Sequence, residues 1–259
     1  VADIAFYFMY LLFMAILLKC FYEAAATAVE TLGNITLFIR LLVPAYLVSV
    51  GVSGGSATAG IACQLMLFVI YGVETILSQG IISLIYSYVM LSMVNGIWVE
   101  EKLSMLVELL KEVIGWALKG AVGVITGISI FQALITPVVD SARSSALQKL
   151  VSALPGVGNL ADGAVELVLG SALVIKNSIG VVLLLLMLVL CAAPLLKIAL
   201  IAGVLKCAAA FMGVVSDKRI TTCVDRAGEG GLLLLRTTGT AMLLFLISIA
   251  VVTAASGRS

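Results

Sequence analysis

Residues 179–190, with the sequence IGVVLLLLMLVL, decide the fold, and this apolar run continues past Pro194 to about Val215. A helix that crosses a bilayer needs about 20 mostly apolar residues, so the run is long enough for two passes or a hairpin. Comparable stretches lie on both sides of it, at residues 4–19, 35–53, 58–73, 79–98, 113–135 and 231–254. The sequence therefore predicts an all-α, polytopic membrane protein, with residues 1–259 forming a single transmembrane domain.

The composition agrees with a membrane location. Of the 259 residues, 63% are hydrophobic and 11% are charged, whereas a typical soluble domain has about 45–50% apolar and about 25% charged residues. A bilayer is the solvent that accommodates this excess of apolar surface. The net charge is +1, so no global field favours nucleic acid or an acidic partner.

The absence of histidine restricts the chemistry that the chain can perform. The residues GVSG at 51–54 match the GxSG pattern of rhomboid-type intramembrane proteases, but no histidine is present to take the serine proton. The glycine pairs Gly51 with Gly55 and Gly123 with Gly127 form GxxxG motifs, for which helix packing is the favoured interpretation. There is no P-loop and no CxxC pair among the five cysteines. We expect no enzyme, and no catalytic, cofactor-binding or metal-binding residues.

Two short segments interrupt the apolar pattern with proline and glycine. One covers residues 42–55 and the other residues 153–159. Irregular backbone is tolerated at membrane depth where it is buried in protein or lines a wet cavity, and paired breaks are typical of transport pathways. We expect two re-entrant hairpins, with ordinary polar loops or kinks as the alternative. The candidate pathway residues are Pro44, Gly51, Gly54, Pro155, Gly156, Gly158 and Asn159.

Two amphipathic segments share one pattern. Apolar residues at 103, 106, 107 and 110 fall on one helical face, and the same spacing recurs 117 positions later. The polar residues follow the same shift, since Glu108 corresponds to Asp225 and Glu112 to Glu229. A duplication accounts for this match. The alternative is a chance similarity, because the helical period alone produces part of it.

The duplication predicts how the domain is organised. Residues 1–33 form an N-terminal span and linker, residues 34–135 the first repeat, residues 136–151 a linker, and residues 152–259 the second repeat. The linker is predicted to be a surface loop that turns into a helix. Each amphipathic segment is expected to be an interfacial helix before the last span of its repeat. Its charges are mixed in sign, which favours packing against the spans over lipid recognition.

Charged residues within apolar stretches are a further guide to a pathway. Lys197 and Lys206 are each flanked by short apolar runs. Both are candidates for a cavity or pathway, and the alternative is that they snorkel to an interface. Glu74 lies near turn-like residues, so we expect it at an interface.

Several segments resemble the stage III sporulation protein AE family. The resemblance runs over most of the chain and is densest from 127 to 180. It is carried by GISIFQ at 127–132, TP at 136–137, DS at 140–141, SALQK at 145–149, LPGVGN at 154–159, GS at 170–171 and IKNSIG at 175–180.

The resemblance implies a role in endospore formation. Members of this family belong to a channel or secretion-like complex between mother cell and forespore, in the mother-cell membrane around the forespore. The implied partners are an ATPase, ring-forming proteins and a forespore channel protein, and a homo-oligomer is also possible. Family members carry a further N-terminal secretory and extracytoplasmic region, which we expect upstream of Val1.

Three functions remain open from the residues and the resemblance. The first is a membrane component of that complex, required for forespore development. The second is a self-contained secondary transporter for a small solute, which the duplication with its breaks would suit. The third is a structural membrane scaffold, which the lack of a strong polar constellation favours.

Overall fold

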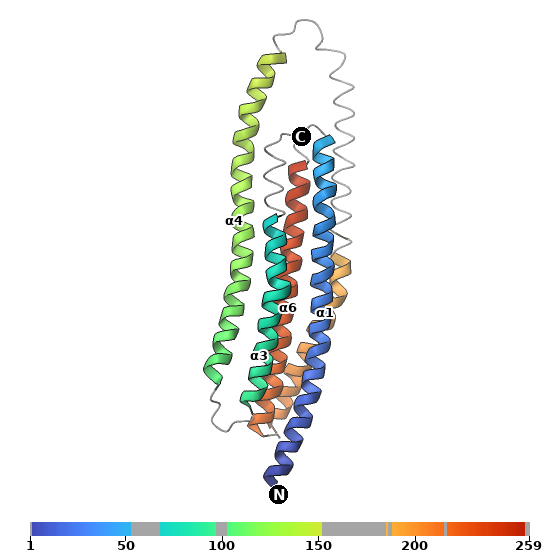
Figure 1. Cartoon of the computed structure of the whole chain (residues 1–259), viewed down its shortest axis with the longest axis vertical. Coiled ribbons are helices and arrows are strands. Elements are labelled where there is room, and N and C mark those ends of the chain that lie inside the picture. Colours follow the sequence, from blue (N-terminus) through green and yellow to red (C-terminus); the bar gives the residue numbers. More distant parts are fainter. Residues whose placement is uncertain are drawn as a thin grey trace.

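The computed structural model describes residues 2–52, 68–96, 103–151, 185, 188–214 and 217–256 (Figure 1). Within these ranges the chain is helical and contains no strand. The elements are α1 (Ala2–Val52), the π-helical turn η1 (Ile76–Ile81), α3 (Ile82–Asn95), α4 (Ser104–Val151) and α6 (Lys218–Ser256). η1 and α3 belong to one helical run, Phe68–Asn95, and a further helix covers Leu188–Val214.

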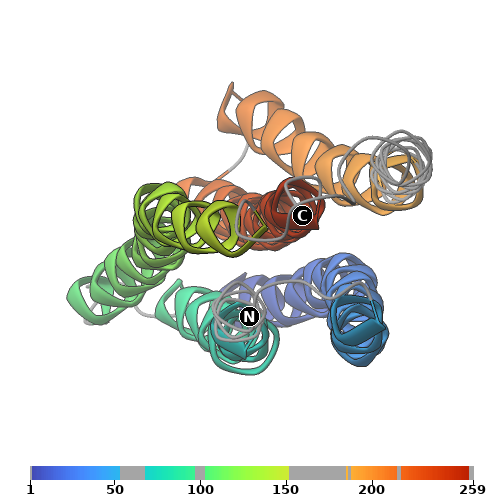
Figure 2. The ribbon, with the colours of Figure 1, turned by 90° about the horizontal axis from the view of Figure 1, so that it is seen from above.

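The helices form an elongated bundle around α6. The view from above places α6 between α4, α1, α3 and the helix Leu188–Val214 (Figure 2). α6 contacts α1, α3 and α4 directly. The helix α3 runs antiparallel to α1 and α6 (Figure 1). α6 therefore holds the position from which side chains can reach all the other described helices.

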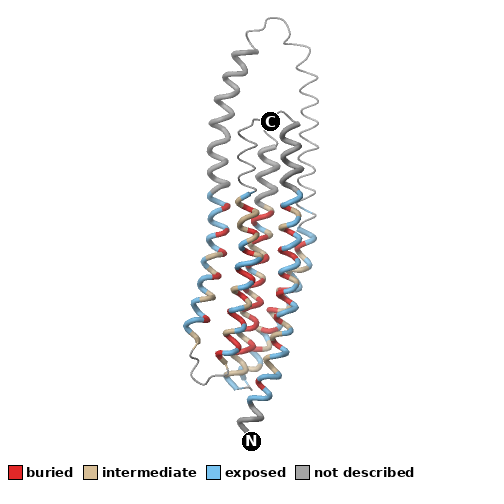
Figure 3. Tube along the Cα trace, viewed as in Figure 1, coloured by how far each residue is buried: buried red, intermediate tan, exposed pale blue. Residues whose placement is uncertain are grey.

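The core follows the inward faces of α1, α3 and α6 (Figure 3). On α1 the buried positions include Ala24, Ala25 and Ala28, whose small side chains allow another helix to approach closely. Leu234 and Phe245 of α6 are among the fully buried side chains opposite. Close packing of this kind supplies much of the attraction between helices in a membrane, where lipid tails are as apolar as leucine.

The outward faces are apolar as well. Large hydrophobic side chains such as Phe8, Trp116, Leu200 and Phe211 are exposed. Soluble monomers rarely expose apolar surface on this scale, whereas lipid-facing helices do so throughout. Four helical stretches are long and apolar enough to cross a membrane, namely Tyr7–Leu41, Phe68–Asn95, Leu188–Val214 and Lys218–Leu246. The prediction of an all-α membrane protein is confirmed.

The glycines of α6 explain how tightly the bundle closes. A Cβ atom on Gly231 would lie 2.9 Å from the Cβ of Ala202, and one on Gly228 would lie 3.1 Å from the Cγ of Lys206. A Cβ on Gly230 would collide with Val89 of α3. The predicted packing pair Gly123 and Gly127 is different, since neither has a described atom within 4 Å of its Cβ position. Among the described residues no neighbour packs against this pair, so its role in helix packing stays a prediction.

α1 joins regions that the sequence pattern separates. The predicted first span, linker and second span form one helix of 51 residues, about 76 Å long at about 1.5 Å per residue. The helix continues through Pro44 and Gly51, where the sequence predicts a break. Proline removes one backbone donor, and a membrane helix tolerates this where neighbouring groups satisfy the freed carbonyl. Residues 53–55 of the predicted break lie outside the described residues.

α4 and α6 also correct the predicted boundaries. Each amphipathic segment is the first part of a long helix, so neither is a separate interfacial helix. Residues 136–151, predicted to begin as a surface loop, continue α4 to Val151. This segment contains alanine, leucine, glutamine and lysine, which favour helix. The second predicted break, at 153–159, lies outside the described part of the chain, and the division into two repeats stays a prediction.

Candidate functional site

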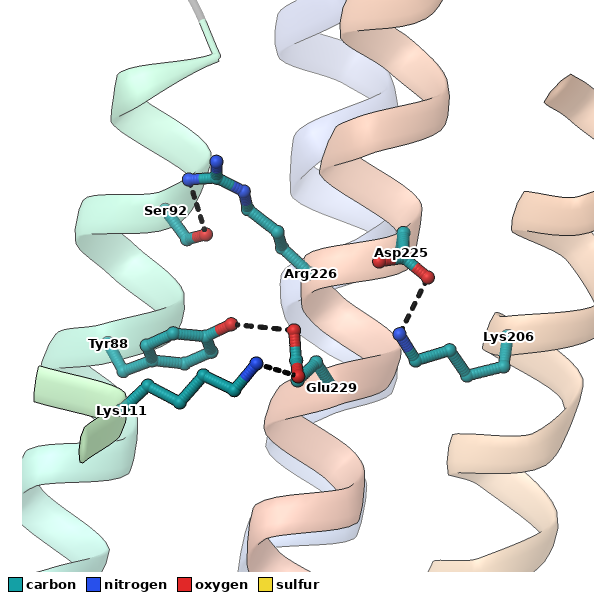
Figure 4. Close-up of polar contacts among 7 residues, drawn as sticks. All are labelled: Tyr88, Ser92, Lys111, Lys206, Asp225, Arg226 and Glu229. Atoms are coloured by element: carbon teal, nitrogen blue, oxygen red, sulfur yellow. Dashed lines mark hydrogen bonds and ion pairs between the residues drawn. The ribbon is translucent and has the colours of Figure 1, made fainter. Parts of the chain in front are cut away.

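Seven polar side chains meet between four helices and form what we call the polar cluster. They come from α3, α4, α6 and the helix Leu188–Val214, and α6 contributes three of them (Figure 4). The members of the polar cluster are Tyr88, Ser92, Lys111, Lys206, Asp225, Arg226 and Glu229.

Glu229 has two partners within the polar cluster. Its carboxylate pairs with the Nζ of Lys111 at 2.5 Å, and it accepts a hydrogen bond from the hydroxyl of Tyr88 at 3.2 Å. The side chain of Glu229 is 26% exposed and that of Lys111 is 41% exposed. A carboxylate in this half-buried position is stabilised by a charged partner and a donor together. Glu229 thereby joins α6 to both α3 and α4.

The two other contacts of the polar cluster lie one turn away on α6. The Nζ of Lys206 lies 2.6 Å from the Oδ1 of Asp225. The guanidinium of Arg226 donates to the hydroxyl of Ser92 at 3.4 Å, on the side facing α3. Asp225 and Arg226 are neighbours in sequence, so their side chains leave α6 in different directions. The same turn of α6 therefore binds two helices on different sides.

Glycines on α6 let the neighbouring helices approach closely enough for these polar contacts. Gly228, Gly230 and Gly231 surround Glu229 in the sequence, and each is approached closely by a neighbouring helix. Small residues at helix interfaces let two backbones come together, which favours interhelical polar contacts. The polar cluster and the tightest packing of α6 thus coincide.

Two further bonds fix the end of α3 beside the polar cluster. The hydroxyl of Tyr10 donates to the carbonyl of Met93 at 3.0 Å, which joins α1 to α3. The Oδ1 of Asn95 accepts from the backbone N–H of Leu103 at 2.8 Å, just before α4 begins. These bonds help to set the position of α3, which carries Tyr88, and of the start of α4, which carries Lys111.

The predicted pathway residues have different outcomes. Lys206 belongs to the polar cluster, as an ion-pair partner. Lys197 is exposed on the same helix. Pro44 and Gly51 have helical backbone in α1. The other candidates, Gly54, Pro155, Gly156, Gly158 and Asn159, lie outside the described residues.

Glu74 was expected at an interface, which stays a prediction, but its side chain does not extend out of the bundle. Its side chain is fully buried, and neither carboxylate oxygen has a hydrogen-bond partner among the described residues. Sequence analysis also did not single out Glu229 and Asp225 as site residues, although the repeat comparison named both. The sequence signal that could have identified Glu229 is a carboxylate next to several glycines in a helix with long apolar runs.

In chemical terms the polar cluster is a set of interhelical ion pairs and hydrogen bonds. Within the described ranges, no three cysteine, aspartate or glutamate side chains gather as metal ligands. Half-buried charges at this position bind helices to one another, and a change in any one of them would alter how the helices pack. The arrangement therefore suits a role in helix packing or in its rearrangement.

The bundle and its interhelical charges define a helical membrane protein with a polar cluster near the end of α3 and the beginnings of α4 and α6. The chain belongs to the stage III sporulation protein AE family, whose model matches residues 1–256. Stage III sporulation protein AE of Bacillus subtilis (strain 168) is 23% identical over 253 residues, which are 97% of this chain and 63% of that protein. The chain thus spans less than two thirds of this relative's length. No solved structure matches the chain.

Proposed function

We propose that the chain is a multi-pass membrane component of a channel or secretion-like complex between mother cell and forespore, located in the mother-cell membrane. Membership of a stage III sporulation family is the observation that carries this proposal. The four apolar helical stretches support it, because a conduit subunit must be embedded in the bilayer. The partners we propose are an ATPase, ring-forming proteins and a forespore channel protein of the same complex.

The polar cluster supports an assembly role for this component. Its contacts join α3, α4, α6 and the helix Leu188–Val214, so the position of each of these helices depends on the others. A subunit that contacts both ring-forming proteins and an ATPase needs helices that are firmly bound to one another. In this proposal the polar cluster keeps the bundle in one arrangement while the complex works.

Deletion of the gene in a sporulating host tests the proposal. We expect forespore development to stop after engulfment, while vegetative growth stays normal. The full-length gene restored at another locus should return the number of heat-resistant spores to the wild-type level. A deletion strain that forms heat-resistant spores in normal numbers would overturn the proposal.

A structural scaffold is the second candidate function, and one observation favours it. The ion pairs of the polar cluster are satisfied by partners within the chain. Cysteine-accessibility labelling at residues 155–159 separates the two candidates. Labelling by a water-soluble maleimide along this segment would favour a conduit, and uniform protection would favour a scaffold.

A further inference from the structure

Glu74 is a fully buried carboxylate without a hydrogen-bond partner among the described residues. It lies on the helical run Phe68–Asn95, its side chain is 0% exposed, and both of its oxygens lack a hydrogen-bond partner among the described residues. By contrast, Asp225 and Glu229 pair with lysines. An ionised carboxylate without a partner is strongly disfavoured in an apolar interior, and such a group takes up a proton instead.

The charged side chains on the surrounding helices do not neutralise Glu74. Arg40 of α1 is exposed and its guanidinium donates to the hydroxyl of Tyr71 at 2.8 Å. Lys119 of α4 and Arg236 of α6 are also exposed, as is Lys197 on the neighbouring helix. The buried thiol of Cys191, on that same helix, interacts electrostatically with Glu74 and carries no positive charge to pair with it.

The local backbone is irregular beside Glu74. The π-helical turn η1 begins at Ile76, two residues further along, and contacts α1, α4 and α6. π-helical turns are rare, and they occur frequently at functional sites. A regular apolar span would be favoured by leucine at position 74 and by an unbroken α-helix. Both departures fall within one turn of the chain, where η1 contacts three other helices.

We infer that Glu74 is a proton-binding site inside the bundle, and that its carboxyl holds an exchangeable proton. Because no described group accepts or donates to the carboxyl, no hydrogen bond within the described part of the chain locks this proton in place. Release of the proton leaves an unpaired carboxylate in the buried interior of the bundle, two residues before η1. The helices around η1 must then move to admit water or a cation, so protonation of Glu74 and helix packing are coupled. This inference does not depend on the proposed function.

Infrared difference spectroscopy of the full chain in lipid bilayers tests the site. The spectrum of the wild type minus that of Glu74→Gln should contain the carbonyl band of a protonated carboxyl at neutral pH. In heavy water this band should shift to lower frequency, because deuterium replaces an exchangeable proton. The matched control is Glu112→Gln, which removes an exposed carboxylate of α4 and should give no such band.

Two results would overturn the inference. A spectrum with the carboxylate bands in place of the carbonyl band would mean that Glu74 is ionised. A carbonyl band that does not shift in heavy water would mean that its proton does not exchange. If Glu74→Gln does not fold, Glu74→Asp provides the second comparison, since it keeps the carboxyl in a different position and should move the band. An unmoved band in that variant would assign it to another residue and would also refute the site.

Discussion

Lys111 of α4 and Glu229 of α6 form an ion pair of 2.5 Å between helices that are distant in the sequence. The same carboxylate accepts from Tyr88 of α3 at 3.2 Å. Removal of Glu229 therefore leaves two groups without their partner, whereas removal of Lys111 leaves the carboxylate with its tyrosine. The carboxylate is also the less exposed of the two charges.

This asymmetry predicts the order of two mutational effects. Glu229→Ala should lower the free energy of unfolding by about 2–3 kcal/mol, and Lys111→Ala by about 1 kcal/mol, because an unsatisfied half-buried partner adds its own cost. Thermal or denaturant unfolding in lipid or detergent measures both. Glu112→Ala is the control, since Glu112 is exposed on α4 and should change stability by less than about 0.5 kcal/mol. Equal effects for Glu229 and Lys111 would contradict the central position assigned to the carboxylate.

The pair of Lys206 and Asp225 predicts an interaction that a double-mutant cycle can isolate. The side chains are 31% and 46% exposed, so we expect a coupling energy of about 1 kcal/mol, near the upper end for accessible pairs. The measurement combines Lys206→Ala, Asp225→Ala and the double variant. In the control cycle, Lys197→Ala replaces Lys206→Ala, and its coupling to Asp225 should be close to zero. Coupling in the control cycle of the same size would show that the effect is not the ion pair.

Two glycines of α6 should respond to alanine with opposite sign. At Gly231 the new Cβ would lie 2.9 Å from the Cβ of Ala202, so Gly231→Ala should destabilise the bundle by about 1–3 kcal/mol. At Gly239 no described atom lies within 4 Å of that position. Gly239→Ala should therefore stabilise the helix by about 0.5–1 kcal/mol, because alanine favours helix. Unfolding measurements on both variants decide, and a destabilised Gly239→Ala would place this face of α6 against a neighbour.

Sequence reasoning identified the class of protein and the inward face of α6. Hydrophobicity and its period report burial in lipid or in a core, so the apolar stretches and the face at 220, 223, 224 and 227 could be found. At all four of these positions of α6 the residue is buried or partly buried. The matching face of α4 is less protected, since Leu106 is exposed. Burial depends on which helices are neighbours in the bundle, and the sequence alone does not show which helices these are.

The pairing of charges was the part that sequence could not supply. Lys111 and Glu229 belong to helices whose contact depends on the packing of the whole bundle, and neither residue carries a local motif. The continuity of α1 through Pro44 was missed for a related reason. Proline in a sequence predicts a local break. In a long apolar helix, the cost of one proline is outweighed by the many residues that favour the helix. The burial of Glu74 was missed because its turn-like neighbour Gly72 suggested a helix end, whereas the structure continues the helix through Gly72 into the π-helical turn.

The contact between Gly231 and Ala202 also predicts a disulfide that would verify the bundle directly. The Cβ position of Gly231 lies 2.9 Å from that of Ala202, and Cβ atoms of natural disulfides lie about 3.5–4.5 Å apart. A small shift of the helix therefore allows Ala202→Cys and Gly231→Cys to be oxidised to a disulfide, in a chain whose own cysteines are replaced by serine or alanine. Proteolysis between the two helices followed by non-reducing electrophoresis should then show linked fragments. Leu200→Cys with Gly231→Cys is the control, because Leu200 is exposed, and its fragments should separate. Linkage in the control but not in the test pair would mean that the helix Leu188–Val214 presents its other face to α6.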